Sequence, residues 1–275
     1  MTKIALIGAG GKMGYRLTKN LKDSEFEASH VEVNEAAAKR IETDFGVRCV
    51  DIDTALSTAE AVILAVPDVA IGKVAASIND KLRPGTMVIV LDAAAPFAGH
   101  LPERDDLTYF VTHPCHPSVF NHEATAEAQS DYFGGLSARQ GIVCALMQGP
   151  EDAWELGEKI ARTIYAPVHS SYRVTVEQMA MLEPALSETV CGTLLTILRE
   201  AMDECVARGV PKEAAREFVL GHANIMLAVL FEEIPGQFSD ACNKAIENGR
   251  PILINSDWKS VFEPAAVLES IRRIT

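Results

Sequence analysis

The stretch THPCHPSVF, residues 112–120, places His113 and His116 three residues apart, each followed by proline, with Cys115 between them. Imidazole can act as a general base, a substrate anchor or a metal ligand, so this segment could do chemistry at neutral pH. The proline after each histidine predicts that both histidines are extended in a stiff loop. A rigid loop whose histidines bind backbone carbonyls is the alternative without function, and Cys115 is expected to be structural.

A second candidate is Glu183, which directly precedes Pro184 in the apolar run MAMLEPAL. A carboxylate among methionine and leucine side chains must be paired, neutral or bound to a ligand, although an ion pair within a helix would also satisfy it. Glu177 and Glu188 lie on the same predicted helix. His222 is expected to be a core histidine. Residues left open as substrate contacts are Asn121, Arg139 and His169.

The first strand and first helix meet in IALIGAGGKMG, which predicts a dinucleotide-binding turn. Small residues at such a junction permit a tight turn, let backbone N–H groups approach a pyrophosphate, and let the helix pack on the strand. The spacing is a variant, because Met13 occupies the third glycine position of a strict GxGxxG. The residues expected to contact the cofactor here are Gly8, Ala9, Gly10, Gly11, Lys12, Met13 and Gly14.

Two further strand ends support the same pocket. Glu32 ends the second strand, 32 − 8 = 24 residues after the first glycine, where a carboxylate can accept hydrogen bonds from the adenosine ribose. Val33 follows it, where an NADP site often has arginine, so the sequence favours NAD over NADP; an exposed glutamate is the alternative. Val66, Pro67 and Asp68 end another strand and are expected at the same edge of the sheet.

The elements that must position these residues follow a clear order. Apolar runs at 3–8, 28–33, 47–50, 61–67, 86–92, 108–114 and 141–149 alternate with helical patterns, which is typical of βαβ units and a parallel sheet. After residue 172 the pattern becomes helical throughout, with Pro184 as a kink or restart. We therefore predict an α/β protein in which a Rossmann-type parallel-sheet domain, residues 1–172, binds NAD and an all-helical domain, 173–275, serves substrate binding and dimerisation.

Composition excludes several classes of function. The formal net charge of −13 and the lack of a basic block argue against nucleic acid or anionic membranes as partners. The six cysteines form no CxxC pair and no signal peptide precedes the first strand, so we expect reduced thiols and a cytoplasmic location. No apolar stretch is expected to span a bilayer.

Taken together, GAGGKMG, AVPD, HPCHPSVF and the C-terminal FSDACNKAIENGRP…DWKSVFEP resemble the D-apionate oxidoisomerase family, which has a phosphogluconate-dehydrogenase-like C-terminal domain. The resemblance covers nearly the whole chain. It implies NAD-dependent oxidation of the small sugar acid D-apionate at C2, followed by a 1,2-shift of the carboxylate-bearing group to give 3-oxo-isoapionate. The lack of lysine in LSETVCGTLLTILRE disfavours phosphogluconate as a substrate.

Such a shift benefits from a divalent cation (Zn²⁺, Mg²⁺ or Mn²⁺) that polarises the ketone and stabilises the alkoxide. On this chemistry we expect His113 and Glu183 as metal ligands and catalytic residues, with His116 and Glu188 in support. A plain NAD-dependent hydroxyacid or prephenate-type dehydrogenase, and a dinucleotide-binding sensor without turnover, are the alternatives. The apolar runs ANIMLAVLF and CGTLLTIL further predict a homodimer joined through the helical domain.

Overall fold

The structure, a computed structural model, describes residues 1–274 and divides into two compact units. The first comprises Met1–Glu183 with the C-terminal segment from Leu268, and the second comprises Pro184–Val267. The division falls within the long helical stretch, whereas the sequence places the change of domain after residue 172. The assignment of substrate binding and dimerisation to the helical part stays a prediction.

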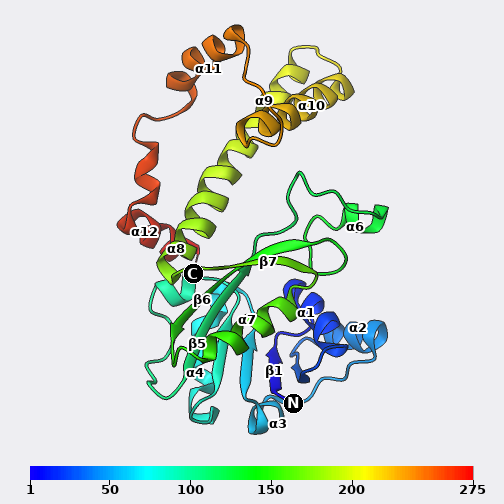
Figure 1. Ribbon diagram of the computed structural model, residues 1–275, viewed down its shortest axis with the longest axis vertical. Coiled ribbons are helices and arrows are strands. Elements are labelled where there is room, and N and C mark those ends of the chain that lie inside the picture. The colour runs from blue at the N-terminus through cyan, green and yellow to red at the C-terminus, as the bar shows by residue number, and fades with distance from the viewer. Residues whose placement is uncertain (275) are drawn as a thin grey trace. The chain divides into compact units, whose positions relative to one another are not determined.

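One seven-stranded sheet forms the centre of the first unit, in the order β2-β1-β3-β4-β5-β6-β7 (Figure 1). The strands are β1 Lys3–Ile7, β2 Glu27–Val31, β3 Ala61–Leu64, β4 Met87–Val90, β5 Thr108–Pro114, β6 Gln140–Gln148 and β7 Val168–Arg173. Strands β1 to β5 run parallel, so their carboxyl ends share one edge; β6 is antiparallel to β5, and β7 is parallel to β6. The predicted parallel sheet is confirmed for the five strands that lead to the candidate residues.

Helices cover both faces of this sheet. They are α1 Lys12–Lys22, α2 Glu35–Phe45, α3 Ile52–Thr58, α4 Asp68–Ile78, α5 Ala94–Phe97, α6 Ala126–Ser130, α7 Ala153–Ile164 and α8 Val176–Ala180, with a short 3₁₀ turn η1 at Asn79–Lys81. Asn34 caps α2 by accepting from the N–H of Ala37, and Gly46 ends it in the left-handed region, as a helix end requires. The strand predicted at 47–50 is wrong, because only Cys49 forms an isolated bridge, to His30.

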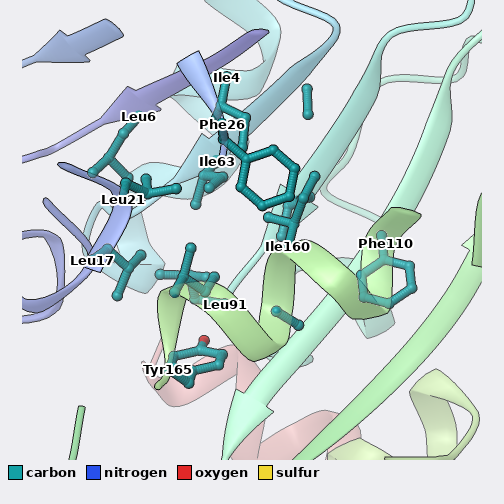
Figure 2. Packing of buried hydrophobic residues seen from close by; sticks show 14 of the residues in the cluster. Ile4, Leu6, Leu17, Leu21, Phe26, Ile63, Leu91, Phe110, Ile160 and Tyr165 are labelled. Carbon is teal, nitrogen blue, oxygen red and sulfur yellow. The ribbon is translucent and has the colours of Figure 1, made fainter. Parts of the chain in front are cut away.

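Alternation along the strands builds two cores. Ile4 and Leu6 of β1 face one side, where they pack with Leu17 of α1 and Ile160 of α7 (Figure 2). The intervening residues of the same strands face the other side and pack against α3, α4 and α5. Because successive side chains of a strand point to opposite faces, apolar residues at every position bury both sides of the sheet.

The second unit is helical. Its elements are the π-helix η2 Met181–Gly192, which begins in the first unit, α9 Thr193–Ala207, α10 Lys212–Leu230, α11 Asp240–Leu253 and the 3₁₀ turn η3 Trp258–Phe262, followed by α12 Pro264–Ile274, which ends in the first unit. The predicted helical character of this part of the chain is confirmed. Of the two alternatives for Pro184, a restart of the helix is wrong, because the residue lies inside the π-helical segment; a kink there stays a prediction.

The continuous helical stretch Val176–Ala207 is long and apolar enough to cross a membrane by length and composition, contrary to the expectation from the sequence. Only 11% of its most apolar window is buried. Glu183 and Glu188 lie within it, and carboxylates are costly in the apolar interior of a bilayer. Only the length and composition of this helical stretch therefore favour a membrane span.

His30 in β2 predicts a pH dependence of stability. Burial lowers the pKa of this histidine from 6.5 to about 4, despite a backbone hydrogen bond to Ala28 that raises it. As pH falls, the imidazole takes up its proton in the unfolded chain before it does so in the folded protein. The folded state is therefore fully stable above pH 6.5 and loses up to about 3 kcal/mol as pH falls towards 4.

Urea unfolding at pH 7 and pH 4.5 measures this loss. We expect His30→Leu to flatten the pH dependence of the unfolding free energy, whereas His122→Leu, at an exposed position, leaves it as in the wild type. Equal slopes for the two variants would show that His30 does not titrate as its burial requires.

Candidate functional site

The turn between β1 and α1 is shaped by glycines that admit no side chain. Gly8 has φ +85°, and a Cβ there would overlap the carbonyl of Ala65, which follows β3. A Cβ on Gly14 would overlap the carbonyl oxygen of Gly8, and one on Gly10 would lie 2.7 Å from the Cβ of Ala37. The turn therefore lies in the crevice between the ends of β1 and β3, where the strand order reverses and dinucleotides bind.

Gly11 differs from the other three glycines. A Cβ there would lie 3.4 Å from the Gly8 carbonyl oxygen and would otherwise meet little, and the residue itself is exposed. Gly11 is the N-cap of α1 with ordinary backbone angles, and Lys12 and Met13 open the helix. This open face is the part of the turn that a pyrophosphate could approach.

Glu32 lies beside this turn, at the end of β2. Its carboxylate accepts from the N–H of Gly10 and from the N–H of Asn34, both at 2.8 Å. The next residue, where an NADP site often has a cation, is the uncharged Val33, whose side chain is 94% exposed. Backbone N–H groups therefore orient this glutamate. The alternative interpretation, a glutamate exposed at a strand end without partners, does not describe it.

The histidine cluster lies along the same edge of the sheet. His113 Nε2 lies 3.2 Å from Glu183 Oε2, and its Nδ1 lies 3.7 Å from Asp92 Oδ2. One ligand atom from each of these three residues lies within 4.8 Å of the others. Asp92, two residues beyond β4, was missed in the sequence, although VLD ends a strand just as AVPD does.

Hydrogen bonding decides which nitrogen of His113 can do chemistry. Nδ1 lies 2.8 Å from the carbonyl oxygen of Leu91, which accepts its proton. In the neutral ring Nε2 then carries a lone pair that faces a carboxylate oxygen at 3.2 Å. Two acceptors at that distance require a proton or a cation between them.

The charges of His113 and Glu183 influence each other's pKa. Burial lowers the pKa of His113, but the hydrogen bond and charge of Glu183, with Asp92 and the Leu91 carbonyl, outweigh it and raise the pKa overall. Burial raises the pKa of Glu183, but the hydrogen bond and charge of His113 outweigh it and lower the pKa overall. The two groups therefore favour each other's charged forms, imidazolium and carboxylate.

Two further carboxylates make this edge acidic. Burial raises the pKa of Asp92, and the N–H of Ala94, which donates to it at 2.6 Å, only partly offsets that effect. Desolvation and the charge of Glu183 raise the pKa of Asp68, at the start of α4, against the opposing charge of His113. One imidazole and several carboxylates are donors of the kind that divalent cations prefer.

His116 shows a difference from the sequence-based expectation. His113 lies in β5 and is extended as predicted, but His116 has φ +59°, so the extended conformation predicted for it is wrong. Its Nδ1 lies 2.8 Å from the carbonyl oxygen of Phe133, and its ring packs on the Phe133 ring at 4.8 Å. These contacts offset the cost of about 1–3 kcal/mol that such a backbone conformation carries.

Helix α1 fixes the 115–139 loop, which connects β5 to β6 and includes Phe133. Arg16, Lys19 and Asn20 donate to the successive carbonyls of Gly134, Leu136 and Gly135, each at 3.0 Å. Lys12 and Arg16 also lie over the Phe133 ring, each 4.3 Å from its centroid. The helix that begins at the dinucleotide turn thereby also sets the position of His116.

Several sequence candidates lie outside this cluster. Asn121 and the backbone N–H of Arg139 donate to Glu123, which gives both residues a structural role in the loop. Glu177 is exposed near the start of α8. Glu188 is exposed in the second unit, so its role as a further ligand stays a prediction.

His222 is exposed and stacks on Phe218, so the expectation of a core histidine is wrong. His169 is exposed and lies 2.9 Å from the Ser170 hydroxyl.

Known proteins give this geometry its class and its family. Residues 121–275 match the family described as phosphogluconate dehydrogenase (decarboxylating), C-terminal, and residues 3–96 match the coenzyme F420-dependent NADP oxidoreductases. A dinucleotide crevice with an acidic residue after β2, beside a histidine and carboxylates, is that of an NAD-dependent oxidoreductase.

Within that class the chain belongs to the D-apionate oxidoisomerase family. It is 67% identical over 275 residues to the D-apionate oxidoisomerase of Rhizobium rhizogenes, covering all of both chains. It is 64% identical over 273 residues to that of Cupriavidus necator, covering 99% of each. The resemblance inferred from the sequence motifs is therefore confirmed.

Solved structures agree with the fold. A Cupriavidus necator protein described as a semialdehyde dehydrogenase NAD-binding protein, crystallised with calcium and NAD, is 64% identical, with a TM-score of 0.98 and full coverage of both chains. An NADH-preferring ketol-acid reductoisomerase from an uncultured archaeon is 17% identical, with a TM-score of 0.72 over 99% of this chain and 82% of the other. The second likeness concerns the fold alone.

The four glycines of the turn allow a matched test. We expect Gly14→Ala to destabilise the protein by about 2–3 kcal/mol and to weaken NADH binding more than tenfold, because α1 must move away from Gly8. Gly11→Ala is expected to leave the melting temperature unchanged and to weaken only NADH binding, because its methyl group occupies the open face of the turn. Melting curves and NADH titration by fluorescence measure both effects; equal melting temperatures for the two variants would contradict this account of the turn.

Proposed function

We propose that this protein oxidises D-apionate at C2 with NAD⁺ and isomerises the product to 3-oxo-isoapionate. The observation that carries the proposal is His113 Nε2 facing Glu183 at 3.2 Å, at the edge of the sheet that also holds the dinucleotide turn. Relatives of this name match the chain from end to end. Their substrate is extended to this protein on that basis.

A divalent cation fits between His113, Glu183 and Asp92. One imidazole nitrogen and two carboxylate oxygens are donors suited to Zn²⁺, Mn²⁺ or Mg²⁺, and three protein ligands leave positions open for substrate. A cation would also offset the negative charge of these residues, which otherwise repels a sugar acid. Bound there, it would polarise the C2 ketone and favour ionisation of the C3 hydroxyl. Calcium in the crystals of the Cupriavidus protein is a property of that protein, and supports the proposal only by likeness.

His116 is the candidate base for the hydroxyl proton. Its Nδ1 is committed to the Phe133 carbonyl, so Nε2 is the basic atom. The pKa of His116 is lowered, mainly by burial and further by the charge of His113. The hydrogen bond to Phe133 raises it but does not outweigh these effects. The ring is therefore neutral at pH 7 and able to accept a proton while hydride leaves C2 for the nicotinamide.

Atom balance defines the second step. Loss of the proton from the C3 hydroxyl lets that oxygen form a ketone, and a substituent of C3 moves with its electron pair to C2. The C2 carbonyl oxygen takes up a proton and becomes a hydroxyl group. The migrating group must therefore be a hydroxymethyl group on C3, and the shift of the carboxylate-bearing group expected from the sequence does not balance.

The first test is NADH formation at 340 nm with D-apionate, before and after chelation and with Mg²⁺, Mn²⁺ or Zn²⁺ restored. We expect activity to be lost on chelation and recovered with metal. Glu183→Gln, Asp92→Asn and His113→Gln are expected to lower kcat at least 100-fold and to weaken Mn²⁺ binding measured by calorimetry. Glu177→Gln, an exposed carboxylate nearby in the sequence, is the matched control and should leave both unchanged.

Other outcomes of this assay decide between the proposal and its alternatives. NADH formation that is indifferent to chelation would remove the metal and return His113 and Glu183 to acid–base roles. A product that NMR identifies as the unrearranged 2-oxo acid would make the protein a plain dehydrogenase. Without turnover on D-apionate, the substrate assignment fails while the dinucleotide site is still tested by NADH binding.

We also propose that a second copy of this chain covers the second unit. Between Pro184 and Val267 the buried apolar residues are mostly small, whereas many large apolar side chains are exposed. The exposed ones include Leu194, Leu195, Phe218, Ile225, Leu230, Phe231, Ile246, Ile252 and Leu253. Fully burying one such side chain stabilises by roughly 1.5–3 kcal/mol, so these helices gain most of their stability from a partner surface.

A groove in the same unit supports a helical occupant. It has a volume of about 780 Å³ and is lined by residues of η2, α9 and α11, together with Trp258 and Val261. Its wall is almost wholly apolar, formed by Val190, Leu194, Ile197, Met226, Ile246 and Leu253. The acidic net charge disfavours an anionic membrane as the occupant, and an identical helical unit offers the matching apolar faces.

Light scattering during size exclusion tests this proposal. We expect a mass of twice 29.7 kDa for the wild type. Leu194→Glu should shift the protein towards monomer and lower its melting temperature, whereas Tyr132→Glu, at an exposed position in the first unit, should do neither. A monomeric wild type, or binding to neutral phospholipid vesicles in place of self-association, would contradict the proposal.

A further inference from the structure

Two residues of opposite charge, Glu32 and Arg40, contact Gly10, and only Glu32 has a role in the site described above. Gly10 donates its N–H to Glu32 Oε2 at 2.8 Å, and Arg40 Nη2 donates to the carbonyl oxygen of Gly10 at 2.7 Å. A carboxylate and a guanidinium are therefore held on the same residue of the dinucleotide turn. Glu32 lies at the end of β2 and Arg40 on α2, so the position of each side chain is set by a different element.

We infer that Glu32 and Arg40 together determine which dinucleotide binds: Glu32 excludes NADP, and Arg40 is a specificity-determining cation that reads the 2′-phosphate once Glu32 is neutralised. The inference rests on the proposed dinucleotide function of the turn. It goes beyond that function because it assigns a role to Arg40 and predicts a second cofactor for a single substitution.

The orientation of Arg40 is fixed before any cofactor arrives. Its guanidinium lies over the Tyr15 ring, 4.6 Å from the centroid, and Tyr15 donates its hydroxyl proton to Asp44 at 2.9 Å. Tyr15 also packs against Phe45 at 4.6 Å between ring centroids. Only one of the five guanidinium N–H donors is needed for the Gly10 carbonyl, and a planar guanidinium held on a ring matches phosphate geometry.

Glu32 keeps a 2′-phosphate away for two reasons. Its charge repels the phosphate, and its two oxygens occupy the N–H groups of Gly10 and Asn34, each at 2.8 Å. A ribose hydroxyl can donate to the same carboxylate, which suits NAD. A neutral, shorter side chain removes the repulsion and frees the N–H of Gly10, on the residue whose carbonyl oxygen accepts from Arg40.

The probe is 2′,5′-ADP, which carries the 2′-phosphate but no nicotinamide, with 5′-ADP as the ligand that lacks it. Calorimetry is expected to show that Glu32→Ser binds 2′,5′-ADP at least tenfold more tightly than the wild type does. Adding Arg40→Gln should cancel that gain at least tenfold. Binding of 5′-ADP should weaken by the same factor in both variants, because both lack the carboxylate that accepts from the ribose hydroxyl. Arg48→Gln, which removes an arginine that pairs with Glu42, is the matched control and should leave the gain intact.

A gain that survives Arg40→Gln, or no gain in Glu32→Ser, would overturn the inference. Glu32→Gln provides a second background, because its amide oxygen can still accept from Gly10 and hold the turn. Loss of 5′-ADP binding in both backgrounds would also overturn it, since Glu32 would then be required for the turn itself. None of these measurements involves D-apionate, so failure of the proposed reaction and failure of this inference are distinguishable.

Discussion

The packing of α1 against the glycine turn is the constraint on which the rest of the site depends. Gly14 lies so close to the carbonyl of Gly8 that no side chain fits between helix and strand end. That contact fixes where α1 begins. Further along the same helix, Arg16, Lys19 and Asn20 donate to carbonyl oxygens of the 115–139 loop and hold it in place. The loop in turn holds His116 through the Phe133 carbonyl. The helix that begins at the dinucleotide turn therefore also positions this histidine.

The electrostatics of the sheet edge follow from the parallel strands. Residues after β3, β4 and within β5 supply Asp68, Asp92 and His113, and the chain returns Glu183 to the same edge. Burial, and to a smaller extent the neighbouring carboxylates, raise the pKa values of Asp68 and Asp92, so their charged forms are costly at this edge. An apolar replacement would be more stable, so this arrangement is best explained by a positive ligand that the residues share, whether the proton of His113 or a cation.

How much the sequence could predict depended on the range of the interactions. The glycine turn, Glu32 and His113 were predictable because strand ends and turn chemistry are local. The conformation of His116 was not, because it depends on a carbonyl seventeen residues away that no local pattern reveals. The reversal of β6 was equally hidden, since a buried apolar run reads the same in either direction. His222 was misplaced because an apolar helix suggests burial, which a single copy of the chain does not provide.

Glu183 shows how an irregular backbone and a functional side chain become one feature. It lies in the π-helical segment just before Pro184, which has no N–H to offer an α-helical hydrogen bond. The wider π-helical turn accommodates that loss, and such turns recur at functional sites. A regular α-helix continuing from α8 would direct residue 183 differently. The proline is therefore part of what brings the carboxylate to 3.2 Å from His113, in a helix that could otherwise have remained regular.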